Sequence, residues 1–143
     1  MNIKPECYII SAHTGQYDTT RHVALGNELD RLGYAKKEVA GSYQGTQEQS
    51  WLVIAEDYSE TRLEIRELLL DYHQECALYL DSNREAYFVY PDGTEEHRGK
   101  WVEVSAVQAQ KLDGYTRDIA RDKYYAIVNK PIAGIVGALD SVN

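Results

Sequence analysis

Two short polar segments of this sequence combine residue types that could bind a cation. Tyr43 and Glu48 lie five residues apart in the segment 41–50, which contains two glycines and leads into an apolar run. Gln74 and Glu75 directly precede a second apolar run. A carboxylate at the edge of a buried strand is desolvated more than a surface acid, so it usually has a partner. Two such acids at one end of a sheet would form a site for an ammonium or sulfonium group.

A structural role for the same acids is the alternative interpretation. Glu48 could pair with Arg21 or cap a backbone N–H group, and Glu75 could simply be exposed. Ion-pair networks of this kind resemble active sites in their composition. At the level of the residues, both interpretations stay open.

Common catalytic and metal-binding signatures are absent from the sequence. It contains no phosphate-binding GxxxxGK, no GxGxxG after a strand, no GxSxG and no HExxH. Cys7 and Cys76 fall in predicted strands, where reduced, buried thiols are expected rather than a disulfide or a reactive thiolate. No metal site is expected, because the four histidines include no pair at i, i+4 spacing. They are His13, His22, His73 and His97.

The composition favours one soluble domain spanning residues 1–143. The 143 residues include 15 basic and 23 acidic side chains, which give a net charge of −8, and the mean hydropathy is −0.52. No stretch approaches the roughly 20 apolar residues that cross a bilayer, and residues 1–6 lack the apolar core of a signal peptide. We therefore expect a cytoplasmic protein that does not bind membranes. Nucleic acid is not expected as a partner either, because phosphate contacts need a basic face.

The acidic excess lies in the middle of the chain. Residues 51–100 carry five basic and twelve acidic side chains, whereas the flanking segments are almost balanced. A solvated helix surface explains this pattern better than a long-range electrostatic function, because six of the acids follow one face of a predicted helix. These acids are Glu56, Asp57, Glu60, Glu64, Glu67 and Asp71.

Hydrophobic periodicity predicts the secondary structure that would position the two polar segments. Strands are expected at 7–12, 34–40, 49–55, 76–80, 85–90 and 101–105, and helices at 19–32 and from residue 59 or 60 to 72. This order predicts an α+β fold: a ferredoxin-like (split βαβ) antiparallel sheet with two helices on one face. Extra C-terminal hairpin strands are expected at residues 115–117 and 124–128, although residues 106–120 could be partly helical. Residues 129–143 are expected to form a C-terminal tail.

Three local signals define the ends of these elements. Residues 41–48 are rich in turn formers and are expected to form the loop between the second and third strands. Gly33 stands where the first helix should end. Thr61 and Glu64 fit a capping box at the start of the second helix.

The order and spacing of several short segments make the chain similar to a known family. They are residues 9–12 (IISA), 20–22 (TRH), the 41–43 turn with its later Glu48, 74–76 (QEC), 101–104 (WVEV), 112–118 (LDGYTRD) and the tyrosines at 124 and 125. Over residues 8–128 the sequence resembles the phage-encoded S-adenosylmethionine lyases, formerly described as S-adenosylmethionine hydrolases. It departs from their pattern in a shorter gap between Tyr43 and Glu48 and in a longer C-terminal tail.

The resemblance implies a ferredoxin-like fold and a homotrimer with active sites between subunits. It also implies cleavage of S-adenosylmethionine to methylthioadenosine and homoserine lactone, with no cofactor or metal. In infection, such an enzyme in the host cytoplasm depletes the methyl donor that many restriction systems need.

We assign roles to the candidate residues on this basis. Glu48 would hold the ammonium group or the sulfonium region of the substrate, and Tyr43 would orient it through a hydrogen bond or a cation–π contact. Gln74 and Glu75 would bind the ribose or the amino-acid end. Residues 11–14 would line the adenosine pocket, and they include Ser11, Ala12 and His13.

Two other functions are compatible with the residues. A non-enzymatic anti-restriction protein that imitates DNA would display two ordered rows of surface carboxylates. A ferredoxin-like nucleotide sensor would bind its ligand without cleaving it. The sequence does not distinguish a lyase from a hydrolase, since both release methylthioadenosine.

Overall fold

The computed structural model describes residues 4–13, 19–43, 45–55 and 58–129, without the side chains of Tyr43 and Tyr58. Within these residues the chain forms eight strands and three helices. In chain order they are β1 (Cys7–Ser11), α1 (Thr19–Arg31), β2 (Lys36–Tyr43), β3 (Thr46–Ile54), α2 (Tyr58–Asp71), β4 (Ala77–Leu80), β5 (Glu85–Val89), β6 (Glu95–Val104), α3 (Ala106–Ala109), β7 (Gly114–Asp118) and β8 (Lys123–Val128). The expected tail lies outside the described residues from residue 130 onward.

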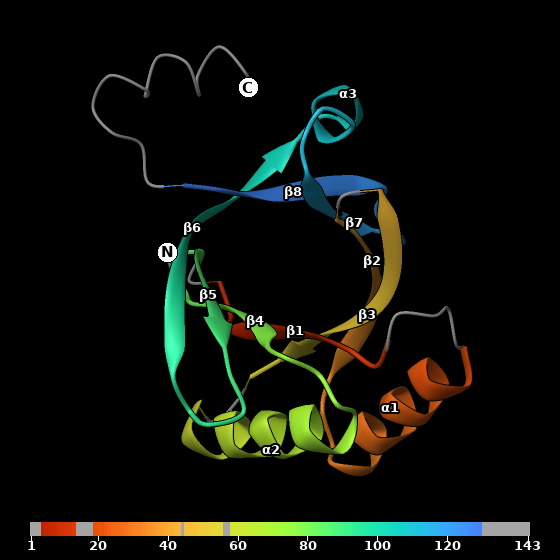
Figure 1. Ribbon diagram of the computed structural model, residues 1–143, viewed down its shortest axis with the longest axis vertical. Coiled ribbons are helices and arrows are strands. Elements are labelled where there is room, and N and C mark those ends of the chain that lie inside the picture. Colours follow the sequence, from red (N-terminus) through yellow and green to blue (C-terminus); the bar gives the residue numbers. More distant parts are fainter. Residues whose placement is uncertain (1–3, 14–18, 44, 56–57, 130–143) are drawn as a thin grey trace.

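The strands form one closed antiparallel barrel in the order β1-β3-β2-β7-β8-β6-β5-β4 (Figure 1). The prediction of a ferredoxin-like sheet is therefore wrong. Strands β4, β1, β3 and β2 are neighbours in that order, but the sheet does not end at β2 or β4. Instead β7 pairs with β2, β5 pairs with β4, and β6 and β8 complete the ring.

Closure depends on strand pairing that the hydrophobic pattern does not reveal. The edge strands of an open sheet keep unpaired N–H and C=O groups, and pairing them with further strands removes both edges. β6 supplies the length for this, because it starts at Glu95, six residues before the predicted strand, and pairs first with β5 and then with β8. The first four residues of β6 are exposed and polar, so they lack the apolar signal of a strand.

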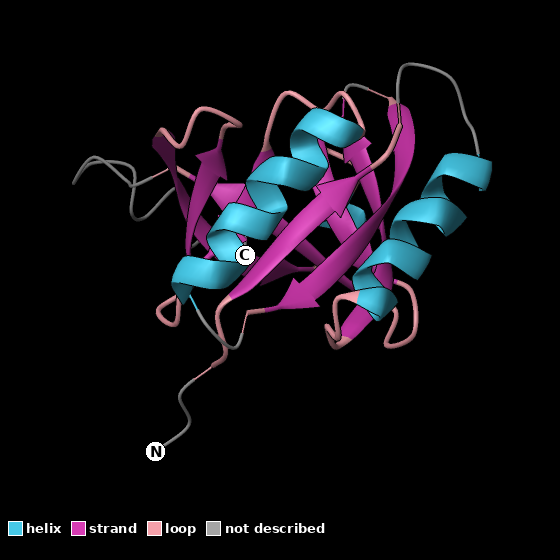
Figure 2. Cartoon of the chain, turned by 90° about the horizontal axis from the view of Figure 1, so that it is seen from below, coloured by secondary structure: helices cyan, strands magenta, loops and turns pink. Residues whose placement is uncertain are grey.

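Helices α1 and α2 pack on the outside of the barrel, on the same side of its wall (Figure 2). Their predicted apolar stripes are confirmed, since both helices bury them against outward-facing residues of the wall. Gly33, with a φ of 87°, ends α1 as predicted. Within the described residues no helix is long and apolar enough to cross a membrane. The shared core includes Tyr8, Ile10, Leu25, Leu29, Val53, Ile65, Leu68 and Leu69.

Two local predictions are wrong for identifiable reasons. The expected 41–48 loop is a tight hairpin, because Gly45, with a φ of 83°, supplies the turn and both strands extend to it. Thr61 lies inside α2 and is buried, so it does not cap that helix. A capping box occurs instead at α3, where the Ser105 side chain accepts from the Gln108 backbone and the Gln108 side chain bonds back.

The inner faces of the strands surround a lumen. Because side chains alternate along a strand, Cys7 and Ile9 face inward from β1 while Tyr8 and Ile10 face the helices. A small inward cluster of Cys7, Leu80 and Ala86 fills part of this space. A cavity of about 470 Å³ remains in the lumen.

Candidate active site

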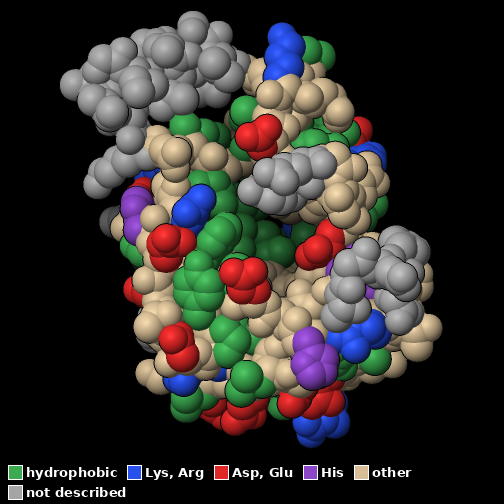
Figure 3. Space-filling view, viewed as in Figure 1, with side chains coloured by type: hydrophobic (Ala, Val, Ile, Leu, Met, Phe, Trp, Pro, Cys, Tyr) green, Lys and Arg blue, Asp and Glu red, His purple; other side chains and the backbone are tan. Residues whose placement is uncertain are grey.

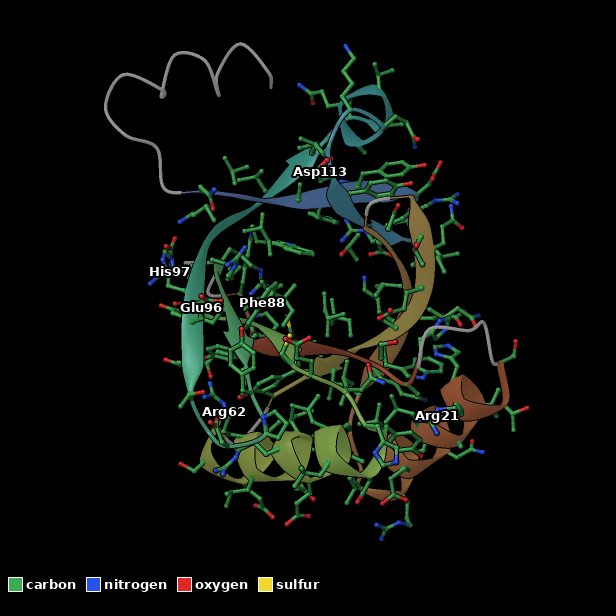
Figure 4. The ribbon with its side chains drawn as sticks, in the orientation of Figure 1. Arg21, Arg62, Phe88, Glu96, His97 and Asp113 are labelled. Atoms are coloured by element: carbon green, nitrogen blue, oxygen red, sulfur yellow. The ribbon has the colours of Figure 1, made fainter. Side chains whose placement is uncertain are left out.

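The antiparallel strands bring acidic residues from four separate segments to one end of the barrel. Strands β3, β4, β6 and β7 start at this end, where β1, β2, β5 and β8 finish. Glu48 is the third residue of β3, Glu75 lies two residues before β4, Glu96 is the second residue of β6, and Asp113 directly precedes β7. We call these four residues the acidic end. In the view of Figure 4, Glu96 lies on the left wall of the barrel and Asp113 lies at its top.

Glu48 is half-buried and faces the lumen. It shares its face of β3 with Leu52 and Ile54, which line the cavity. Gly41 lies opposite Glu48 in β2, so no side chain occupies the neighbouring inward position on that strand. Among the described residues, none forms a hydrogen bond or an ion pair with the Glu48 carboxylate. A half-buried carboxylate in this state is suited to receive a cation.

The pKa of the Cys76 thiol reflects the charges of several acidic residues near it. Burial, and after it the negative charges of Glu75, Glu96 and Glu48, raise the pKa of this thiol to about 11, while Arg98 acts in the opposite direction. One side chain therefore experiences all three carboxylates. Strand order places Glu48, Glu75 and Glu96 at the same end of the barrel, and the catalytic and binding roles of Glu48 and Glu75 stay predictions.

An apolar wall lies beside these acids. Strand register places Leu52, Ile9, Leu78 and Phe88 next to one another across four adjacent strands, and the same row ends at Glu96. Seen down the barrel, acidic side chains surround a hollow with hydrophobic side chains at its centre (Figure 3). The combination suits a small cation that also carries apolar or ring groups.

The comparison with known families agrees with this chemistry. A model of the S-Adenosylmethionine lyase family matches residues 9–128. The chain belongs to the S-adenosylmethionine lyase family. Membership indicates S-adenosylmethionine, which carries a sulfonium and an ammonium group, as the small-molecule substrate that is cleaved. No curated protein matches the chain.

The predicted adenosine-pocket residues lie where β1 ends and are held by internal hydrogen bonds. The Ser11 hydroxyl donates to the Gln49 carbonyl at 3.1 Å and accepts from the His13 N–H at 3.1 Å. The Gln74 side-chain amide donates to the carbonyls of His13, at 2.6 Å, and Tyr72, at 3.0 Å. Gln74 therefore joins the end of β1 to the end of α2. Residue 14, also predicted for this pocket, lies outside the described residues.

Arg21 completes the same joint and is not the partner of Glu48. Its guanidinium donates to the Ala12 carbonyl at 2.8 Å and to the Tyr72 carbonyl at 2.7 Å, and it lies 5.5 Å from the centre of the Tyr72 ring. Ala12 is fully buried. Arg21 therefore holds the segment before residue 14 and does not pair with Glu48. Glu75 is exposed, as the structural alternative expected.

The remaining candidates differ in what the structure shows. Tyr43 ends β2 opposite Thr46, and its side chain lies outside the described part of the chain.

Glu96 is not among the residues predicted from the sequence, although extending the predicted strand back to the turn at Gly93 would have placed it beside Phe88. Glu96 accepts a hydrogen bond from Tyr90 at 3.2 Å. In the described ranges, no three His, Cys, Asp or Glu side chains are grouped to hold a metal ion.

Proposed function

We propose that the acidic end binds S-adenosylmethionine and promotes its cleavage to methylthioadenosine and homoserine lactone. The substrate carboxylate attacks its own γ-carbon, a carbon–oxygen bond forms, and the carbon–sulfur bond breaks. The electron pair of that bond passes to sulfur, which leaves as a neutral thioether. The reaction needs no external nucleophile, proton donor or metal ion.

The half-buried Glu48, which has no hydrogen-bond or ion-pair partner among the described residues and shares its face of β3 with Leu52, is the observation that carries this proposal. In the transition state the carboxylate and sulfonium charges neutralise each other, so a less polar site than water favours the reaction. The wall of Leu78 and Phe88 supplies such surroundings. Glu48 would hold the ammonium group and so keep the flexible amino-acid chain folded for attack, which supplies the entropic part of catalysis.

Other predicted residues have supporting roles in this proposal. Glu75 would add negative charge at the amino-acid end, and Tyr43 would orient the substrate. Ser11, Ala12 and His13 would line the adenosine pocket at the end of β1. Gln74 would act mainly by positioning that segment, since its amide already bonds to His13 and Tyr72.

We also propose a homotrimer with sites between subunits, and depletion of the methyl donor of restriction systems in a phage-infected cell. Both rest on the family resemblance. Light scattering on the purified protein tests the first, and a monomer that cleaves S-adenosylmethionine at full rate would contradict it. Survival of restriction-sensitive phage in cells expressing the protein tests the second.

The decisive experiment follows methylthioadenosine by chromatography after the purified protein is incubated with S-adenosylmethionine. Glu48→Gln should lower the rate by about 10- to 100-fold, because a charged contact contributes roughly 1.5–3 kcal/mol. The matched control is Glu67→Gln on the exposed surface of α2, which should stay within about twofold. Unchanged cleavage by folded Glu48→Gln protein would contradict the role of Glu48.

The two alternative functions give different results in the same assay. A nucleotide sensor would bind S-adenosylmethionine in calorimetry and release it intact. A DNA mimic would form a salt-sensitive complex with a DNA-binding enzyme and give no methylthioadenosine. Early mass spectrometry in ¹⁸O-labelled water separates lyase from hydrolase, since label in the first-formed product would exclude direct release of the lactone.

A further inference from the structure

The cavity of about 470 Å³ lies at the end of the lumen opposite Glu48. Seven strands contribute inward-facing side chains to it, through residues near the starts of β1, β2 and β8 and the ends of β3, β4, β6 and β7. Its size falls within the range of small-molecule sites.

The charge of this cavity is opposite to that of the whole chain. Its lining contains two acidic residues, Glu103 and Asp118, and five basic residues. Positive charge therefore gathers inside a protein whose net charge is −8. We call the five cationic residues of the lining the basic end: Lys4, Lys37, Arg84, Arg121 and Lys123.

Contacts and charge effects connect three of these cations through Asp118 and Cys7. Lys37 pairs with the buried carboxylate of Asp118, which also accepts a hydrogen bond from the Arg121 backbone N–H at 3.3 Å. Arg84 and Lys37 both act on the Cys7 thiol, where they oppose the effect of burial on its pKa.

Two of these cations, Arg84 and Arg121, have no carboxylate partner among the described residues. The Arg84 guanidinium donates to backbone carbonyls of Pro5, at 2.7 Å, and Asp81, at 3.1 Å, rather than to a carboxylate. In the described part of the chain, no carboxylate forms an ion pair with the side chain of Arg84 or Arg121. Guanidinium groups that lack carboxylate partners and line a cavity are suited to bind phosphate oxygens.

The wall of the same cavity also carries a pair of stacked rings. Trp101 from β6 and Tyr125 from β8 lie with their ring centres 5.5 Å apart and their planes 7° from parallel. Both side chains are partly exposed. Such a pair offers a flat surface on which the base of a nucleotide can lie.

We propose that the basic end of the lumen is a second binding site, which takes a small phosphorylated ligand of the nucleoside diphosphate class. Arg84, Arg121 and Lys37 would hold the phosphates, and the base would lie against the Trp101–Tyr125 pair. Multiple cations favour a diphosphate over a single carboxylate. The site is separate from the proposed catalytic site, because Glu48 lies at the opposite ends of the strands.

Calorimetry with uridine 5′-diphosphate tests this site, since that probe lacks the adenosine group of S-adenosylmethionine. Uridine diphosphate should bind more tightly than inorganic pyrophosphate, which lacks a base, and than uridine, which lacks charge. Arg121→Gln should weaken binding by about tenfold, because it removes one charged contact from an exposed turn. The control Arg31→Gln, on the exposed end of α1, should bind the probe as the natural protein does.

Three results would overturn the proposal. They are no saturable binding of uridine diphosphate at millimolar concentration, equal affinity for pyrophosphate, or equal affinity of the Arg121→Gln and Arg31→Gln proteins. Cleavage of S-adenosylmethionine should continue in Arg121→Gln protein and fall in Glu48→Gln protein, while uridine diphosphate binding should show the reverse. The failure of one site is thereby distinguished from the failure of the other.

Discussion

The two ends of the barrel are built by the same eight strands and carry opposite charge. At the acidic end, the charges of Glu75, Glu96 and Glu48 raise the pKa of the Cys76 thiol. At the basic end, Lys37 and Arg84 approach the Cys7 thiol. The net charge of −8 conceals this separation, because it sums over the whole chain. Within a closed barrel, the position of a charge along its strand decides which ligand it can meet.

The two cysteines provide a probe for each end. Burial is the main cause that raises the pKa of both thiols to about 11. At Cys76 the neighbouring carboxylates act in the same direction as burial, whereas at Cys7 the neighbouring cations act against it. Equal pKa values therefore arise from opposite surroundings.

The largest expected effect comes from a substitution that disturbs the closure of the barrel. Closure holds both ends in one lumen. Gly99 in β6 has a φ of 141°, and a Cβ atom there would lie 2.2 Å from the Val128 carbonyl oxygen. Gly99→Ala should therefore lower the free energy of unfolding by about 3 kcal/mol. Urea unfolding measures this loss. Gly41→Ala is the control, because its nearest contact would be an ordinary 3.6 Å, and an equal loss in both variants would argue against strain at Gly99.

The next effect concerns the ion pair of the basic end, in which a buried carboxylate meets a partly exposed lysine. Lys37→Met should destabilise the protein by about 2 kcal/mol, because it leaves the Asp118 carboxylate, with 5% of its side chain exposed, without its cation. The double variant Lys37→Met/Asp118→Leu should recover most of this loss in urea unfolding. A double variant no more stable than the single one would show that the unpaired carboxylate is not the cause.

A smaller effect should appear in the acid dependence of stability. Burial tends to raise the pKa of Asp118, but hydrogen bonds from Lys37 and the Arg121 backbone, with the two positive charges, outweigh it and leave the pKa below its usual value. The ionised form therefore stabilises the fold at neutral pH, and this contribution disappears as pH falls below about 4 and through the lowered pKa. In urea unfolding from pH 2 to 7, the Asp118→Asn protein should lose less stability at acid pH than the natural protein. Equal losses of stability in the two proteins would contradict this.

The smallest expected effect compares the two thiols directly. Both should react slowly with iodoacetamide at pH 8, because little thiolate is present when the pKa is about 11. Glu75→Gln should speed the labelling of Cys76 by about two- to threefold, since it removes a charge that raises the pKa. Cys7 in the same protein is the internal control. Mass spectrometry of the labelled peptides follows both rates, and equal acceleration of both thiols would indicate general loosening.

The candidate site was predictable where its residues stand next to strong local patterns. Glu48 and Glu75 each lie near the start of a strand, so their shared end of the sheet followed from an antiparallel arrangement. Glu96 was not predictable in this way, because the exposed, polar start of β6 has no apolar alternation. The role of Gln74 in joining the end of β1 to the end of α2 depends on its contact with His13, 61 positions away, which no local pattern contains.

The sequence by itself determined the alternation of strands and helices, the faces that α1 and α2 bury, and the family to which the chain belongs. These features depend on short-range periodicity and on the order of short segments. Only the tertiary structure decided that the sheet closes and that the charges separate to its two ends. Lys37 and Asp118, for example, are 81 residues apart and meet through the pairing of β2 with β7. Such registers are set by hydrogen bonding between distant strands, and closure replaces the two sheet edges with one shared lumen.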